Sequence, residues 1–181
     1  TVLQPWSYAE ENPLNMRAFK LRYRLALYYY SLLYEAHETG APVLRPLFYE
    51  FPEDEGCRGT DDVFMAGRAL LVATVLEEGA ELRRVRFPAG CGWVDPYTGT
   101  IYEGGRTYDL PVSRESIPFF QRQGSIVPLI LARQNLETRN SRDIELSVEA
   151  ALPAETTLYL DDGESLDPDE AGLDKVRVTA R

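Results

Sequence analysis

Apolar residues recur with a helical period along the first part of the chain. Between residues 13 and 39 they fall at three- and four-residue steps, so one face of a predicted helix carries Leu14, Ala18, Leu21, Leu25, Tyr28 and Leu32. Further apolar positions widen this stripe, and we expect a helix covered on more than one side. Asn12 and Pro13 predict its start, while Gly40 and Pro42 predict its end.

Residues 43–51 are apolar almost throughout, which is typical of a strand covered on both faces. A helix, a tight turn and a buried strand form the αβ half of a parallel repeat. One helix and one strand cannot close a parallel sheet. We therefore expect the rest of that sheet to come from residues outside this sequence, which opens on Thr1 and reads as part of a longer polypeptide.

The pattern changes after an acidic loop over residues 52–61. Asp61 or Asp62 is predicted to cap a short helix over residues 63–66. Short apolar segments separated by turn residues follow, and they predict strands over residues 69–76, 82–87, 93–94, 100–102, 106–110, 117–120, 125–131, 143–150, 156–160 and 175–179. Strands of this length and spacing indicate an antiparallel sandwich. The polar residues 132–142 are predicted to connect two β units.

Composition excludes some classes of function. A net charge of −10 over 181 residues leaves no basic face for a phosphate backbone, which argues against nucleic acid as a partner. No apolar run approaches the length of a membrane span. Cys57 and Cys91 match no metal or redox spacing, so a disulfide stays open and the compartment, cytoplasmic or secreted, is undecided.

A series of segments carries a resemblance to a known family. RYRLALYYYSLLYEAHETGAPVLRPLFYEFPED resembles the last helix and strand of the catalytic barrel in glycoside hydrolase family 31. DDVFMAGRALLVATVLEEGA resembles the passage out of that barrel, and RFPAGCGWVDPYTGTIYEGG and IPFFQRQGSIVP resemble the first C-terminal β-domain. LYLDDGES resembles the start of the distal β-domain. The sequence departs from the family pattern at Leu27 and Thr74, where prolines are common, and at Gln123-Gly124, where Gly-Gly is usual.

The resemblance implies an α+β chain, mainly β. Residues 1–66 would be the C-terminal end of a (β/α)₈ barrel, residues 67–142 a proximal β-sandwich domain and residues 143–181 the start of a distal β-domain. The whole enzyme would be a retaining α-glycosidase of the α-glucosidase or α-xylosidase type, acting on an α-linked glucoside without a cofactor. Its partner would be the remainder of the barrel.

Retaining glycosidase chemistry needs two carboxyl groups about 5–5.5 Å apart. In the family both are aspartates on earlier barrel strands, and no position of this sequence matches either motif. We therefore expect no catalytic residue in this chain, and its substrate-binding residues are unknown. Asp61 and Asp62 are favoured as capping residues over catalytic ones, and the loop over residues 52–61 is a candidate rim of the substrate cleft.

Three further groups of residues are candidate sites. His37, the only histidine, suits the end of a helix better than a metal or a catalytic triad. Trp93, Tyr97 and Tyr102 are candidates for a sugar-stacking platform, although packing within the sandwich is favoured. An acidic cluster offers oxygen ligands for calcium, but its spacing fits a solvated turn better; it consists of Asp161, Asp162, Glu164, Asp167, Asp169 and Glu170.

A hypothesis from another class stays open: a stand-alone β-rich module that binds carbohydrate or acts as a scaffold. The helix predicted over residues 13–39 separates the two hypotheses. A binding module does not need a long helix that is apolar on several sides, whereas the end of a barrel does. An isolated barrel end should expose a large apolar surface and seek a partner.

Overall fold

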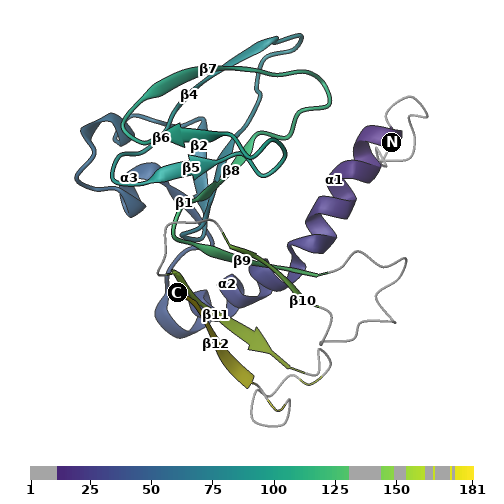
Figure 1. Cartoon of the computed structure of the whole chain (residues 1–181). Coiled ribbons are helices and arrows are strands. Elements are labelled where there is room, and N and C mark those ends of the chain that lie inside the picture. The colour runs from purple at the N-terminus through teal and green to yellow at the C-terminus, as the bar shows by residue number, and fades with distance from the viewer. Residues whose placement is uncertain (1–11, 131–143, 149–153, 162–164, 166–171, 173) are drawn as a thin grey trace.

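Figure 1 shows the computed structural model of the chain, which describes residues 12–130, 144–148, 154–161, 165, 172 and 174–181. The helical elements are α1 (Asn12–Arg24), α2 (Ala26–Thr39), α3 (Leu47–Glu50) and the 3₁₀ turn η3 (Glu55–Cys57). The strands are β1 (Leu44–Pro46), β2 (Val63–Ala66), β3 (Leu70–Ala73), β4 (Leu82–Arg86), β5 (Gly92–Val94), β6 (Ile101–Glu103), β7 (Thr107–Pro111), β8 (Phe119–Arg122), β9 (Ile126–Ile130), β10 (Ile144–Val148), β11 (Ala154–Leu160) and β12 (Asp174–Ala180). The connection predicted over residues 132–142 lies outside the described residues.

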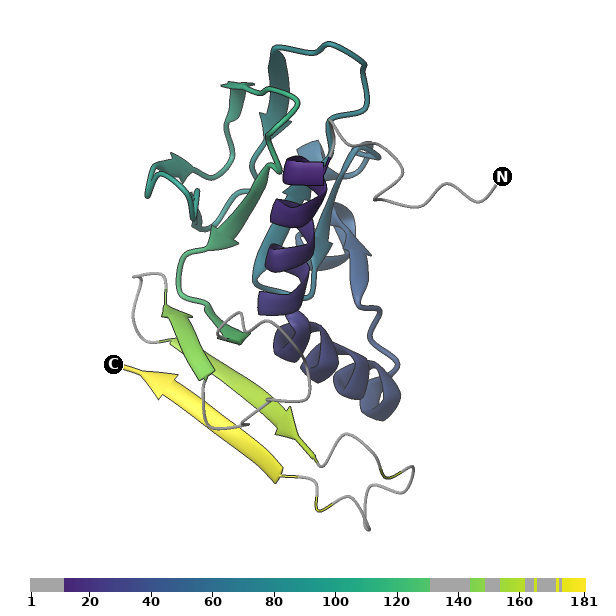
Figure 2. The same cartoon turned by 90° about the vertical axis from the view of Figure 1, so that its right-hand side faces the viewer.

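The helix predicted over residues 13–39 is two helices that meet at Leu25. This residue has φ −81° and ψ 1°, yet hydrogen bonding continues across it. Its N–H donates to Leu21 O over 3.0 Å, and Tyr29 N–H donates to Leu25 O over 3.0 Å. Figure 2 shows that the axes of α1 and α2 diverge here. The bend therefore forms although position 27, a common proline in the family, is leucine.

The end of α2 follows the prediction. Gly40 adopts φ 75°, in the left-handed region that glycine reaches without steric cost, and its N–H donates to Ala36 O over 2.9 Å. The Thr39 hydroxyl donates to Glu35 O and accepts a hydrogen bond from Ala41 N–H. These bonds close the helix and turn the chain toward β1.

The strand predicted over residues 43–51 is wrong beyond its first part. β1 covers three residues, Leu44–Pro46, and the one-turn helix α3 follows. Leu47 and Phe51 are buried at 0 % and 8 % exposure, and Phe51 N–H donates to Leu47 O over 2.9 Å. Their spacing of four residues is helical, whereas Phe48 and Tyr49 between them are about half exposed. A continuous apolar run concealed this period.

The helix predicted over residues 63–66 is also wrong, because this segment is strand β2. It pairs with β3, with Ala66 opposite Leu70 and Val63 opposite Ala73. Gly67 turns the chain between the two strands with φ 59°. All four residues of this segment find ladder partners on β3, and a single helical turn offers no comparable set of hydrogen bonds.

The strands form one six-stranded sheet in the order β1-β2-β3-β8-β5-β6, and β4 and β7 form a separate two-stranded sheet. Every strand pair in the described part of the chain is antiparallel. The mainly β, antiparallel character of the predicted fold class is thereby confirmed. The barrel end stays a prediction, because β1 is paired antiparallel with β2.

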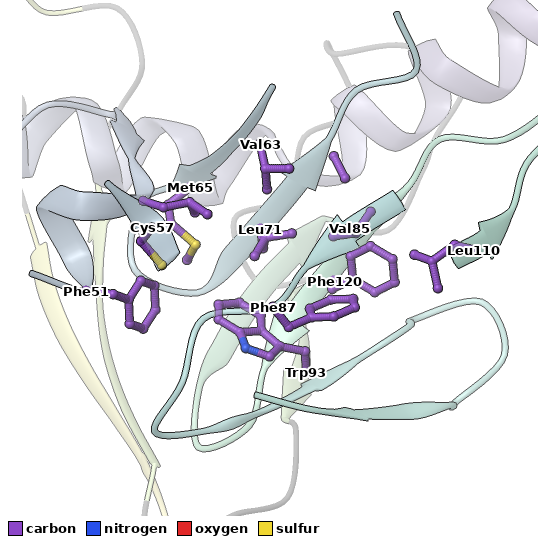
Figure 3. Close-up of a cluster of buried hydrophobic side chains, with 12 residues drawn as sticks. Phe51, Cys57, Val63, Met65, Leu71, Val85, Phe87, Trp93, Leu110 and Phe120 are labelled. Carbon is purple, nitrogen blue, oxygen red and sulfur yellow. The ribbon is translucent and has the colours of Figure 1, made fainter. Parts of the chain in front are cut away.

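A buried core lies between the six-stranded sheet and the β4–β7 sheet (Figure 3). The six-stranded sheet contributes Met65, Leu71 and Phe120, and the β4–β7 sheet contributes Val85 and Leu110, all at 6 % exposure or less. Phe87, which follows β4, and Trp93 of β5 fill the space between the layers. Both residues are fully buried. This packing explains why the alternating segments of the sequence fold as a sandwich.

A second core joins α2 to the edge formed by β2, β3 and β9. Leu25, Tyr28 and Leu32 pack on Ala66, Ala69, Leu70 and Val127. The Tyr28 hydroxyl donates to Ala66 O over 2.7 Å and accepts from Ala69 N–H over 3.3 Å. The predicted apolar face of the helix therefore packs on the β part of the same chain.

The last strands form two further antiparallel pairs, β9–β10 and β11–β12. β11 lies against α2, where Tyr159 stacks on Tyr34 with ring centroids 4.1 Å apart. Tyr159 N–H also donates to the Ser31 hydroxyl over 3.2 Å. The alternation predicted along residues 143–150 concerns side chains that mostly lie outside the described residues, but the backbone of 144–148 is a strand as predicted.

Candidate functional site

Asp54 organises the loop that follows α3. Its carboxylate accepts from Gly56 N–H (3.0 Å), from Ala89 N–H (2.9 Å) and from the Arg86 guanidinium (2.6 Å). Burial by itself would raise the pKa of Asp54, but these hydrogen bonds and the charge of Arg86 bring the pKa below its ordinary value. Asp54 therefore stays ionised at neutral pH and ties the loop to β4. Sequence reasoning missed this pair.

Asp62 likewise forms an ion pair with an arginine of β4, whereas Asp61 takes no part in that pair. The Asp62 carboxylate lies 2.7 Å from the Arg83 guanidinium, which also donates to Asp62 O and Thr74 O. Asp62 thus joins the start of β2 to the end of β3 and to β4, and it caps no helix. Asp61 is exposed. The two carboxyl groups therefore sit in different surroundings, and Asp62 is held by an arginine.

The three residues weighed as a sugar-stacking platform are not together at the surface. Trp93 is fully buried, and its ring N–H donates to Pro88 O over 3.1 Å. Tyr102 stacks on Phe87 inside the sandwich, with centroids 5.0 Å apart. Tyr97 alone of the three is exposed, at 57 %, and its ring meets Phe119 edge-on. Packing is thus the role of two of the three residues.

His37 lies near the end of α2, exposed, with its ring 6.3 Å from that of Tyr34. Among the described residues, no three His, Cys, Asp or Glu side chains are placed to hold a metal ion. Of the acidic cluster weighed for calcium, Asp161 accepts a hydrogen bond from the Tyr30 hydroxyl. The other five acidic residues of that cluster lie outside the described part of the chain.

Both cysteines are free thiols. Cys57 is fully buried beside Asp54, and burial followed by the Asp54 charge raises its pKa to about 11. Cys91 is partly buried, and burial raises its pKa as well. Thiols with raised pKa values are poor nucleophiles at neutral pH, so neither is prepared for catalysis.

Arg45 is a buried charge that sequence reasoning also missed. Its side chain is 1 % exposed and pairs with Glu50 of α3 and, at 3.6 Å, with Glu35 of α2. Its Nε also donates to Pro42 O over 2.6 Å. A single arginine therefore joins the end of α2, the turn after it and α3. An arginine inside an apolar run was the available signal, since such a residue is rarely buried without partners.

Apolar side chains are exposed on the same elements. Six apolar residues between the start of α1 and the end of α3 are each about half exposed to solvent: Met16, Tyr23, Leu33, Leu44, Phe48 and Tyr49. Among the described residues, no helix has the length and apolar character that would let it cross a membrane. Of the elements that carry these exposed side chains, α2 and α3 are joined by the ion pairs of Arg45.

Comparison with known proteins identifies the family. Residues 40–127 match the model of the glycosyl hydrolase family 31 C-terminal domain. The chain belongs to glycosyl hydrolase family 31. It is 38 % identical over 172 residues to a probable glucan 1,3-alpha-glucosidase of Arabidopsis thaliana, and 37 % identical over 167 residues to neutral alpha-glucosidase C of Homo sapiens. The matches cover 91 % and 90 % of this chain, and 18 % of each relative.

Solved structures of family 31 agree with the fold. The structure of a Flavobacterium johnsoniae GH31 dextranase with isomaltotriose superposes with a TM-score of 0.88 at 31 % identity, covering 98 % of this chain and 22 % of that one. The chain thus spans about a fifth of the proteins it matches. It corresponds to the C-terminal domain of a family 31 glycoside hydrolase, as the resemblance implied.

Proposed function

We propose that the chain completes and buttresses the catalytic barrel of a retaining α-glucosidase-type enzyme whose catalytic aspartates lie outside this sequence. The substrate would be an α-linked glucoside, as the names of the relatives suggest. The chain would contribute the last helix and strand of the barrel and the β-domains that brace it. The rim role of residues 52–61 stays part of this proposal.

The apolar side chains that stay exposed on α2 and β1 are the observation that carries the proposal. Leu33 is 59 % exposed and Leu44 is 55 % exposed, on elements whose opposite faces are buried. A helix apolar on two sides is expected to lie between two layers. The β part of this chain is one layer, and a barrel would supply the other.

The β part is suited to bracing. Its core is closed by aromatic side chains, and α2 is fixed to it by the Tyr28 hydroxyl and by packing on Leu70 and Val127. A barrel that packs on α2 would therefore be supported directly by the sandwich. The same features disfavour the alternative of a stand-alone carbohydrate-binding module, which would not keep an apolar helix face exposed.

We further propose the domain division expected from the family: residues 1–66 as the barrel end, 67–142 as the proximal β-domain and 143–181 as the start of the distal one. β2 and β3 pair across residue 66. The first two parts would therefore share a sheet, and we expect them to unfold together.

The proposal is tested by assaying hydrolysis of an aryl α-glucoside. The chain is produced alone and together with the upstream portion of its polypeptide. Turnover only in the combined sample, with retention of configuration at the anomeric carbon, supports the proposal. Turnover by the chain alone overturns it and directs attention to Asp61 and Asp62.

A pair of matched variants tests the docking surface. Leu33→Glu places a charge on the apolar face of α2, whereas Leu76→Glu places one on an apolar residue of the β3–β4 loop that is 73 % exposed. We expect Leu33→Glu alone to weaken association with the upstream portion by tenfold or more, since a buried unpaired charge costs several kcal/mol. Equal association of both variants would contradict the proposed surface.

A further inference from the structure

A groove of about 550 Å³ opens between α1, the turn that joins β5 to β6 and the loop that joins β7 to β8. Its wall includes Tyr97 and Asp95 from the turn, Arg17 from α1, and Glu115 and Ser116 from the loop. Binding sites for small molecules commonly have volumes of about 300–1,000 Å³. The groove is therefore large enough for a ligand of several rings.

The turn that carries Tyr97 is held rigidly by local hydrogen bonds. Tyr97 N–H donates to the Asp95 carboxylate over 2.8 Å, and Asp95 N–H donates to Thr100 O over 2.9 Å. Gly99 has φ 71°, which lets its N–H donate to Asp95 O over 2.8 Å. The ring of Tyr97 is further fixed by its edge-on contact with Phe119. An exposed aromatic ring held this firmly loses little entropy on binding.

The polar atoms around the ring suit a neutral ligand with many hydroxyl groups. The wall carries the carboxylates of Asp95 and Glu115 and the guanidinium of Arg17, which is 3.1 Å from Glu115, and the charge of Arg24 also acts on Tyr97. Hydrogen-bond acceptors and donors of both charges thus lie around the ring, which suits the hydroxyl groups of a neutral ligand. Burial raises the pKa of Tyr97, so its hydroxyl stays protonated and can donate.

We propose that this groove is a glucan-binding subsite in which one sugar ring lies on Tyr97 and its hydroxyl groups bind Asp95, Arg17 and Glu115. The apolar face of a pyranose ring matches an exposed aromatic side chain, and its hydroxyl rim matches carboxylates and guanidinium. The choice of an α-linked glucan rests on the proposed function. The subsite would hold a polymeric substrate to the β-domain, apart from the bond that is cleaved.

The test is calorimetric titration of the intact protein that carries this chain with isomaltotriose and with maltotriose. We expect Tyr97→Ala to raise the Kd of one site by at least about tenfold, as truncation of a central aromatic contact does. Tyr97→Phe keeps the ring and should change the Kd less than about threefold. Leu76→Ala, which removes an exposed apolar side chain outside the groove, should leave the Kd unchanged.

The outcomes separate this inference from the proposed function. Binding that is the same in wild type and Tyr97→Ala, with unchanged thermal unfolding, overturns the subsite even if the protein hydrolyses an aryl α-glucoside. Binding that depends on Tyr97 supports the subsite even if no hydrolysis occurs, and then only the proposed activity fails. The stacking role is also overturned if Leu76→Ala weakens binding as much as Tyr97→Ala does. The same holds if Tyr97→Phe weakens binding as much as Tyr97→Ala.

Discussion

Aromatic residues of the sandwich core are buried, whereas several of those in the helical segment α1–α3 are about half exposed. Phe87 is fully buried and contacts the rings of Trp93, Tyr102 and Phe120. Phe48 of α3 is 49 % exposed. The sandwich has a closed core, to which Leu47, Phe51 and Cys57 also contribute, whereas the helical segment buries one face and leaves apolar side chains exposed on another. One sequence thus joins a region with a closed core to a region with exposed apolar side chains.

The largest effect should come from breaking the closed core. Phe87→Ala removes a buried ring that bridges the two layers, and we expect it to lower the free energy of unfolding by about 4 kcal/mol. Phe48→Ala, the same change in the helical segment, should lower it by less than about 1 kcal/mol. Urea unfolding followed by circular dichroism compares the two. Equal losses would mean that the two regions do not differ in the way described.

The next effect should come from the contact between the regions. A Cβ on Gly67 would lie 2.6 Å from Leu32 Cδ2 and 2.6 Å from the Tyr28 hydroxyl, at φ 59°. Gly67→Ala should therefore cost about 3 kcal/mol, combining the left-handed backbone with overpacking.

Gly40→Ala is the matched control for that change. It has φ 75° with no atom within 4 Å of the new Cβ, so only the backbone cost of about 1–2 kcal/mol applies. The difference between the two variants in urea unfolding measures the packing of α2 on the sheet. Similar losses would show that α2 moves aside freely, against the bracing role.

A smaller effect should follow from removing one hydroxyl at the same contact. Tyr28→Phe leaves Ala66 O and Ala69 N–H without the bonds that they make with the hydroxyl, and we expect a loss of about 2 kcal/mol. Tyr23→Phe, on a tyrosine that is 53 % exposed, should change stability by less than about 0.5 kcal/mol. Hydrogen exchange at Ala69 should quicken in the first variant only, and unchanged exchange would count against the contact.

Much of the fold was predictable where a residue type constrains the chain. The end of α2 at Gly40, most strand positions and the antiparallel pairing followed from glycines and alternating segments. The errors fell on short apolar runs. Residues 43–51 carry both a continuous apolar run and a four-residue spacing from Leu47 to Phe51, and the buried partners that decide between them lie elsewhere in the chain.

The polar contacts were harder to predict than the elements. Asp54 and Arg86 are 32 residues apart, and Arg83 reaches Asp62 across 21 residues, so no local pattern brings them together. For the three aromatics, packing was the favoured interpretation, and β5 and β6 direct Trp93 and Tyr102 into the core. Tyr97, which is close to them in sequence, stays exposed. Recognition of the family, in contrast, needed only the order of the segments.

The smallest predicted effect on stability concerns the hydrogen bonds by which Asp54 holds the loop after α3 to the sandwich, and it depends on pH. The folded-state pKa of Asp54 lies below its ordinary value of 3.8. The carboxylate therefore adds stability above that value, and the contribution is lost as the pH falls through the folded pKa. Asp54→Asn should lower the free energy of unfolding by about 1.5 kcal/mol at pH 7, since it removes charge-assisted hydrogen bonds. Urea unfolding from pH 7 down to pH 3 measures the difference.

Asp109→Asn is the control, because Asp109 and Arg84 form an exposed pair 3.9 Å apart. An exposed ion pair contributes little, so this variant should follow the wild type at every pH. The gap between wild type and Asp54→Asn should narrow as the pH falls below about 4, because the unfolded wild type then takes up a proton that the folded carboxylate does not yet bind. A gap that stays constant to pH 3 would show that Asp54 acts through its shape and not its charge. The loop after α3 would then be held by buried side chains such as Phe51 and Cys57, and not by the charge of Asp54.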